Sequence, residues 1–194
     1  MAHPTKQVRL DQIAAEIVAS NITPDLAKTA KHLVFGAGNP DANIIFIGEA
    51  PGKNEDLTGQ PFVGAAGKIL SELLDNIGLQ RSEVYITSIL KYRPPNNRDP
   101  KPQEKAEFWP YLKAQLEIIE PQLIVTLGRH AANCFLPKLS IGQQHGQLHQ
   151  WAGYRLLPLY HPAAALYNGS MKQTLIDDFA KITTIIPIRK SIHN

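Results

Sequence analysis

Ile44-Ile45-Phe46-Ile47-Gly48-Glu49-Ala50-Pro51-Gly52 sets the architecture of this 194-residue chain, together with a segment more than a hundred residues later, Leu156-Leu157-Pro158-Leu159-Tyr160-His161-Pro162. Both are short apolar runs that pass directly into turn-forming residues. Such runs are typical of buried strands in a mostly parallel sheet. Ligands of these sheets bind beyond the carboxyl ends of the strands. The pattern therefore predicts that the Glu49 carboxylate and the His161 imidazole lie at one edge of one sheet.

Strands and helices alternate along the rest of the chain. We expect strands at 43–47, 84–90, 123–127 and 155–159, and helices at 9–20, 65–77, 103–119, 129–135 and 170–184. The stretch 92–102 contains four prolines and three cations, so we expect a stiff cationic surface loop there, neither helix nor strand. This alternation implies right-handed crossovers and an α/β fold. It predicts a three-layer α/β/α sandwich with a central four-stranded, mostly parallel sheet, in one domain over residues 1–194.

Composition narrows the class of protein. A hydrophobic fraction of 43% and a charged fraction of 19% are ordinary for a soluble globular domain. No run reaches the length of a membrane span, and residues 1–20 lack the apolar centre of a signal peptide, so we expect a cytoplasmic protein. Cys134 is the only cysteine, which excludes an internal disulfide, a multi-cysteine zinc site and a cysteine-held cluster. The net charge of +3 leans towards a polyanionic partner.

Several residues in loops and at strand ends have two interpretations. An acidic loop such as 49–56 is most often simply solvated, and a lone Phe62 or His161 is often structural. Phe62, however, lies between Pro and Gly in a loop, where an aromatic ring can serve as a stacking platform. The Gly64–Lys68 segment faintly resembles a phosphate-binding loop, but its spacing is wrong and Ile69 replaces the magnesium-binding hydroxyl. We expect His145 and His149 to be structural, with no ligand-like partner.

Three longer segments carry a family resemblance. The run from Gly48 to Gly67, the segment from Val84 to Pro95, and Tyr160–Leu166 resemble, in order, the three signatures of the family 4 uracil-DNA glycosylases. The likeness covers roughly residues 20–186. It implies the uracil-DNA glycosylase fold and an enzyme that flips uracil out of DNA and hydrolyses its bond to deoxyribose, leaving an abasic site for base excision repair.

The resemblance also implies roles for individual residues. Glu49 matches the acid that holds the attacking water, and His161 matches the imidazole that hydrogen-bonds uracil O2 as charge develops there. Phe62 matches the aromatic that stacks on uracil, while Ala50 and Ser88 fall in the base-binding set. Glu55 matches a second acid near the pocket. The expected DNA contacts are an apolar insertion by one residue and phosphate contacts by the cations, namely Leu166 with Arg93, Arg98, Lys101 and Lys172.

The chain departs from the family pattern at several positions. Members usually hold an iron–sulfur cluster with four cysteines, but the matching residues here are Asn21, Pro24, Tyr92 and Phe108, so we expect no cofactor. The aromatic residues among them could fill the vacated space. Ser88 replaces an Asn that pairs with uracil, which predicts weaker discrimination between bases. Tyr167 and His145 stand where relatives often have Arg, which puts expected phosphate contacts in doubt.

Three functions remain open from the sequence. The leading one is an active, cluster-free uracil-DNA glycosylase that acts as a monomer on uracil-containing DNA, without a metal or a membrane. A broader glycosylase for deaminated bases is the second, because of Ser88. The third is a non-catalytic DNA-binding module, which the retention of Glu49 with Phe62 and His161 disfavours. Covalent capture of DNA by a loop histidine is disfavoured because 92–102 contains none.

Overall fold

Four parallel strands form the centre of the sheet in the computed structural model, which describes residues 4–187. In spatial order they are β3 (Tyr85–Ser88), β2 (Ile44–Gly48), β4 (Leu123–Leu127) and β6 (Tyr154–Leu159). Every residue of β2, β3 and β4 is buried, as expected for strands covered on both faces. The predicted parallel core is therefore confirmed, and the carboxyl ends of these strands lie at one edge of the sheet.

The prediction of four strands in all is wrong, because two short antiparallel strands extend the sheet. β1 (Ala37–Gly38) pairs with β3, and β5 (His149–Trp151) pairs with β6. Neither has a run of apolar residues long enough to be recognised in the sequence. The β5–β6 hairpin turns through Ala152 and Gly153, both at positive φ (47° and 88°), as a tight two-residue hairpin turn requires.

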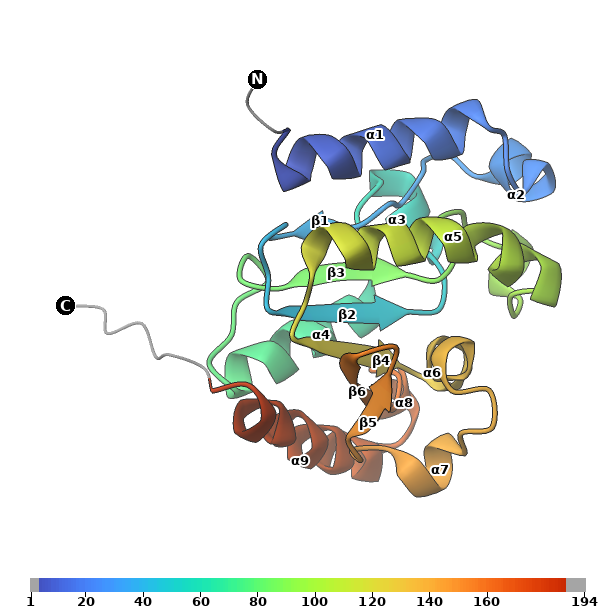
Figure 1. The fold of residues 1–194 in the computed structure, drawn as a ribbon. Coiled ribbons are helices and arrows are strands. Elements are labelled where there is room, and N and C mark those ends of the chain that lie inside the picture. Colours follow the sequence, from blue (N-terminus) through green and yellow to red (C-terminus); the bar gives the residue numbers. More distant parts are fainter. Residues whose placement is uncertain (1–3, 188–194) are drawn as a thin grey trace.

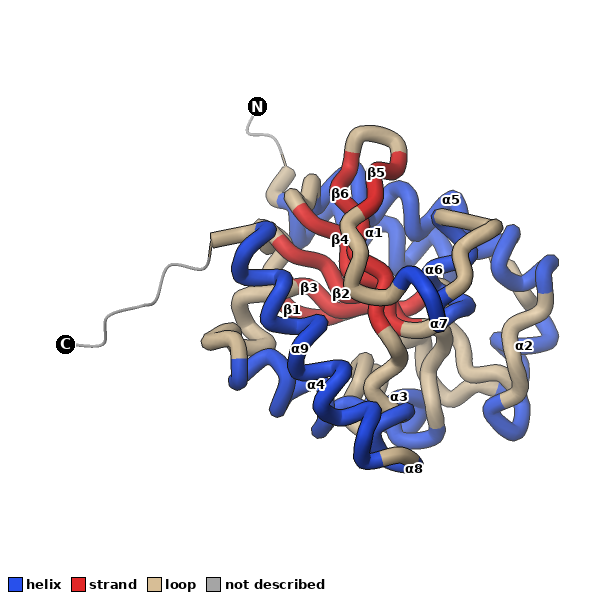
Figure 2. The backbone as a smooth tube through the Cα atoms, turned by 90° about the horizontal axis from the view of Figure 1, so that it is seen from below, coloured by secondary structure: helices blue, strands red, loops and turns tan. Residues whose placement is uncertain are grey.

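Helices cover both faces of the sheet and give three layers (Figure 1). On one face lie α1 (Lys6–Ala19), α5 (Pro102–Ile119) and α6 (Arg129–Phe135), packed on Ile45 and Ile47. On the other face, seen in front of the sheet in Figure 2, lie α4 (Ala65–Asn76) and α9 (Gly169–Ile185), packed on Ile44 and Phe46. Successive residues of β2 thus enter opposite cores, which confirms the predicted sandwich.

Four short helices and one 3₁₀ turn occur where the sequence predicted neither helix nor strand. They are α2 (Pro24–Thr29), α3 (Lys53–Thr58), α7 (Ile141–Gln144), α8 (Ala164–Tyr167) and the 3₁₀ turn Pro95–Asn97. Proline and glycine at their ends hid these helices from the sequence patterns, since Pro24 is the first residue of α2 and Gly52 and Gly59 bound α3. The expectation that 92–102 contains no helical residue is likewise wrong at this 3₁₀ turn and at Pro102, the first residue of α5.

Two aromatic residues fill the region where the family pattern has cysteines. Tyr92 and Phe108 are buried and meet edge to face, with ring centroids 5.9 Å apart. Nearby, the Glu107 carboxylate accepts a hydrogen bond of 2.8 Å from the Thr23 backbone N–H, which ties the start of α2 to α5. Packing and this hydrogen bond therefore fix the N-terminal segment. None of the helices within residues 4–187 is both long and apolar enough to cross a membrane.

Candidate active site

A cavity of about 390 Å³ opens at the carboxyl ends of the parallel strands. Ser88 ends β3, Glu49 follows β2, and His161 lies just beyond β6. Seven of the predicted site residues line this one cavity: Glu49, Ala50, Glu55, Phe62, Ser88, Arg98 and His161. Eight further lining residues were not predicted: Val34, Pro51, Gly52, Pro61, Ala66, Pro94, Asn97 and Ala163. Most of these are small or apolar, which suits a pocket for a planar ring.

Phe62 is held against the end of β2 by two glycines. A Cβ atom on Gly48 would lie 2.6 Å from the Phe62 ring, and one on Gly67 would collide with the Phe62 carbonyl. Phe62 itself adopts a left-handed backbone conformation, with φ of 52°, which is uncommon for an aromatic residue. Its ring stacks loosely with His161, with centroids 5.7 Å apart and planes inclined by 29°. The ring is thus fixed as one wall of the cavity.

Glu55 holds the Phe62 loop in place from the neighbouring helix α3. Its Oε1 atom accepts hydrogen bonds from the backbone N–H groups of Val63 (2.9 Å) and Gly64 (2.8 Å). Gly64 is the N-cap of α4 and has no side chain to cap that helix, so the Glu55 carboxylate serves instead.

His161 has a defined tautomer. The Ala163 backbone N–H donates to its Nδ1 atom at 3.2 Å, so Nδ1 must carry a lone pair and the proton of a neutral ring resides on Nε2. Burial lowers the pKa of His161 to about 4, against the opposing charge of Glu55. At neutral pH the ring is therefore uncharged and offers one Nε2–H donor.

Glu49 is half-buried, and burial raises the pKa of its carboxyl group. Nearby charges modify that pKa: His130, Arg129 and Lys105 lower it, and Asp99 raises it. No donor within residues 4–187 forms a hydrogen bond with this carboxylate. Its oxygens are consequently open to a water molecule.

Glu49, Asp99 and His130 form the one group in the described part of the chain whose ligand atoms could hold a metal ion. One such atom from each residue lies within 4.8 Å of the other two. However, the Arg129 guanidinium already donates to Asp99 Oδ2 at 2.9 Å, and His130 Nε2 lies 3.1 Å from the same oxygen. Asp99 Oδ2 and His130 Nε2, which a cation would need as ligands, are thus bound to each other, and Asp99 Oδ2 is also bound to the Arg129 guanidinium. The donor set fits an ion-pair network better than a metal centre.

A buried lysine next to Ser88, Lys91, was not predicted from the sequence to have a role. Lys91 is fully buried, and its Nζ atom donates to Thr87 Oγ1 (2.6 Å), to the Ser88 carbonyl (2.8 Å) and to Gln115 Oε1. Burial lowers its pKa well below the ordinary value. The lysine ties the end of β3, and with it Ser88, to α5.

The predicted DNA-contacting residues lie outside this cavity, apart from Arg98, and three of them have intramolecular partners. Arg93 donates to Asn97 Oδ1 at 2.8 Å, Arg98 forms a bidentate ion pair with Glu104, and Lys172 pairs with Glu72 at 3.0 Å. Lys101 is exposed. On α8, directly after His161, Leu166 is 45% exposed and its neighbour Tyr167 is 89% exposed.

Two further histidines need separate mention. His145, which we expected to be structural, pairs with the buried Asp178 on α9, with its Nδ1 atom 2.6 Å from Oδ2. His130 was not predicted at all. It follows β4 as Glu49 follows β2, so the rule that pointed to Glu49 and His161 could also have found it.

Comparisons with known proteins show the family to which this chain belongs. The sequence model of the "Uracil DNA glycosylase superfamily" matches residues 35–182. The chain is 49% identical to the type-4 uracil-DNA glycosylase of Saccharolobus solfataricus, over 81% of this chain and 77% of that protein. It is 48% identical to the type-4 uracil-DNA glycosylase of Archaeoglobus fulgidus, over 89% and 91%.

A solved structure supports the fold alone. The solution NMR structure of a candidate uracil DNA glycosylase from Methanosarcina acetivorans superposes with a TM-score of 0.52 at 14% identity, over 79% of this chain and 99% of that one. The likeness in fold thus extends over the greater part of the chain.

Proposed function

Because this chain belongs to the uracil-DNA glycosylase superfamily, we propose that its cavity receives a uracil flipped out of DNA and that Glu49 and His161 hydrolyse the N-glycosidic bond. The protein is a uracil-DNA glycosylase of DNA repair, as are its type-4 relatives. The observation that carries the residue assignment is the meeting of Glu49, Phe62, Ser88 and His161 around one cavity, from distant parts of the chain.

Recognition of the base uses a stacking wall and a polar edge. A uracil in the cavity stacks on the fixed Phe62 ring, while Ser88 and the Ala50 backbone offer hydrogen bonds to its edge. The Ser88 hydroxyl can donate or accept but is too short to do both with neighbouring atoms of the base. This favours a broader range of deaminated bases as a second activity at the same site.

The chemical step divides between Glu49 and His161. A water bound by the Glu49 carboxylate gives that carboxylate a proton as its oxygen bonds to C1′ of the deoxyribose. The C1′–N1 bond breaks through an oxocarbenium-like state, and its electron pair leaves with the base. The neutral His161 donates its Nε2–H to O2, where the resulting negative charge gathers. A raised pKa makes Glu49 a better acceptor for the water proton.

The surroundings of the cavity supply the DNA contacts in this proposal. Leu166 fills the gap left by the flipped base, and the cations contact the phosphates, namely Arg93, Arg98, Lys101 and Lys172. Those cations that have intramolecular partners must exchange them for phosphates on binding. The enzyme acts on uracil-containing DNA as a single-domain monomer in the cytoplasm, with neither a metal nor a membrane.

Glu49→Gln and His161→Ala test the chemical assignment. Each should lower the single-turnover rate of uracil excision by at least about a hundredfold, the usual scale for losing a positioned base or an oxyanion partner. The measurement uses a uracil-containing oligonucleotide and alkaline cleavage of the abasic site. Glu117→Gln, an exposed acid on α5 outside the cavity, is the control and should keep the wild-type rate. Near wild-type rates in both site variants would contradict the mechanism.

A further inference from the structure

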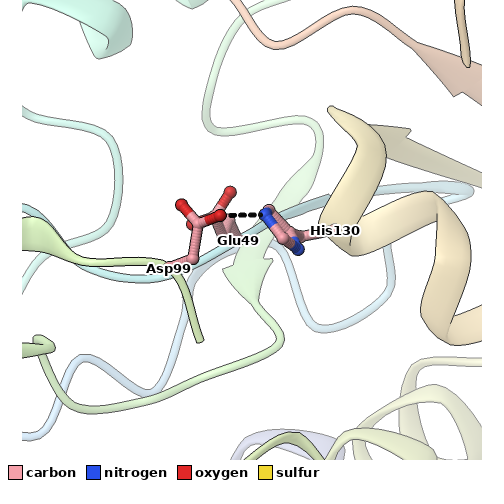
Figure 3. A group of neighbouring side chains, drawn as sticks. All are labelled: Glu49, Asp99 and His130. Atoms are coloured by element: carbon pink, nitrogen blue, oxygen red, sulfur yellow. Dashed lines mark hydrogen bonds and ion pairs between the residues drawn. The ribbon is translucent and has the colours of Figure 1, made fainter. Parts of the chain in front are cut away.

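Asp99 and His130 approach Glu49 from two other parts of the fold (Figure 3). His130 is the second residue of α6, which begins directly after β4, so it belongs to the same sheet edge as Glu49. Asp99 comes from the cationic loop, residues 93–101, which contributes Pro94, Asn97 and Arg98 to the lining of the cavity. Three elements therefore bring two carboxylates and one imidazole together beside the cavity.

The hydrogen bonds in this group show that the Nε2 atom of His130 carries a proton. His130 Nε2 lies 3.1 Å from Asp99 Oδ2 and 3.3 Å from the Arg129 Nε–H. Both cannot be hydrogen bonds at once, because a protonated nitrogen cannot also accept. A carboxylate can only accept, and its contact is the shorter one, so we assign the proton to Nε2 and the bond to Asp99. Asp99 thereby orients the ring.

The charges in this arrangement affect the ionisation of the Glu49 carboxyl group. Asp99 repels a second negative charge at Glu49, and burial disfavours it further. Among the charged groups around Glu49, which are His130, Asp99, Arg129 and Lys105, His130 opposes these effects most strongly. His130 in turn lowers the pKa of Asp99, chiefly through their hydrogen bond, so the aspartate stays ionised and keeps the ring in place.

We propose that His130, oriented by Asp99, is a positioning residue that keeps the Glu49 carboxylate ionised and ready to accept a proton from water. This inference rests on the proposed function of Glu49. His130 does not contact the base and is not a catalytic residue: it acts through Glu49. Asp99 lies between Arg98 and Lys101. Its hydrogen bond with His130 therefore also links the surroundings of Glu49 to the loop that we propose contacts DNA.

The test is the pH dependence of single-turnover uracil excision at saturating enzyme, from about pH 5 to about pH 9. In His130→Gln the amide can still donate to Asp99, but it cannot become a cation as an imidazole can. Glu49 then takes up a proton more readily, so the acidic limb of the profile should move to higher pH by about one unit. Adding Asp99→Asn should move the limb back towards the wild-type position, because the repelling charge is removed.

A second histidine that pairs with an aspartate provides a matched control. His145 does not belong to the group around Glu49, so the acidic limb of His145→Gln should coincide with that of the wild type. Wild-type excision and its loss in Glu49→Gln test the proposed function, whereas only the limb position tests His130. An unmoved limb in His130→Gln, whatever its rate, would overturn the proposal. Loss of the wild-type activity on addition of EDTA would also overturn the proposal, because Glu49, Asp99 and His130 would then hold a metal ion.

Discussion

Ser88 is the residue at which this site differs most from its family pattern. It ends β3, is buried, and lies close to Gly48 and the Phe62 ring, where the edge of a bound base would come. A hydroxyl there can serve one atom of that edge, and a water can reach the next one. Base selection thus depends on the room for a water molecule between Ser88 and the base as well as on the hydroxyl itself.

Replacing this serine by the family residue should sharpen base selection. In Ser88→Asn the amide supplies a donor and an acceptor together, so the ratio of excision rates for uracil and hypoxanthine should rise by about tenfold. Single-turnover rates on the two substrates give the ratio, and Ser82→Asn, an exposed change outside the cavity, is the control. An unchanged ratio would mean that Ser88 does not face the base. Complete inactivity would mean that the pocket has been rebuilt around the smaller side chain.

The buried side chain of Lys91 connects the end of β3 to α5. All three partners of Lys91 act as acceptors: the Thr87 hydroxyl gives its own proton to the Phe35 carbonyl, and the Gln115 amide group donates there too. Lys91 Nζ also lies 5.5 Å from the centre of the Phe35 ring. These contacts favour the ammonium form, while complete burial lowers the lysine pKa.

Lys91→Met should lower the free energy of unfolding by about 3 kcal/mol at neutral pH, because three buried acceptors lose their donor. The wild type carries a second signature. A folded-state pKa below the unfolded value of 10.5 means that unfolding takes up a proton, so this group makes stability rise with pH up to that value. Urea unfolding at two pH values above neutral and below 10.5 should show a more positive change of stability with pH in the wild type than in Lys91→Met. Lys113→Met, a change of an exposed lysine on α5, should keep the wild-type slope.

Sequence patterns predicted the elements with the longest apolar or periodic runs. The strands through Phe46 and Val125 were predictable because successive residues enter the cores on the two faces of the sheet. The helices on both faces were predictable because their apolar residues recur once a turn and pack into one core. Helix α3 was not, since two glycines define its ends. The approach of Asp99 to within 4.8 Å of Glu49 depends on the path of the proline-rich loop, in which Asn96 and Asn97 take left-handed conformations. No local pattern specifies that path.

The molecule as a whole must hold together without the cofactor that its family pattern implies. With Cys134 as its only cysteine, the chain cannot supply the ligands of an iron–sulfur cluster. Tyr92 against Phe108 and the hydrogen bond from Thr23 to Glu107 take over the corresponding region. Stability there comes from packing.

The purified protein should therefore be colourless and free of stoichiometric iron. Visible absorption spectra and metal analysis check this directly, and the thermal midpoint should be the same with and without an iron chelator. A cluster-containing relative, prepared in parallel, is the positive control for both measurements. A brown preparation with bound iron would contradict the prediction.

The placement of one functional side chain at each of four neighbouring strand ends bears on the fidelity of the enzyme. Glu49, Ser88, His130 and His161 depend on β2, β3, β4 and β6, respectively, and no single segment carries two of them. With the roles proposed above, a molecule that loses the register of one strand loses the activator of water, the reader of the base, the support of the leaving group or the residue that positions Glu49. Damage to the fold is therefore expected to abolish excision and not to extend it to undamaged bases.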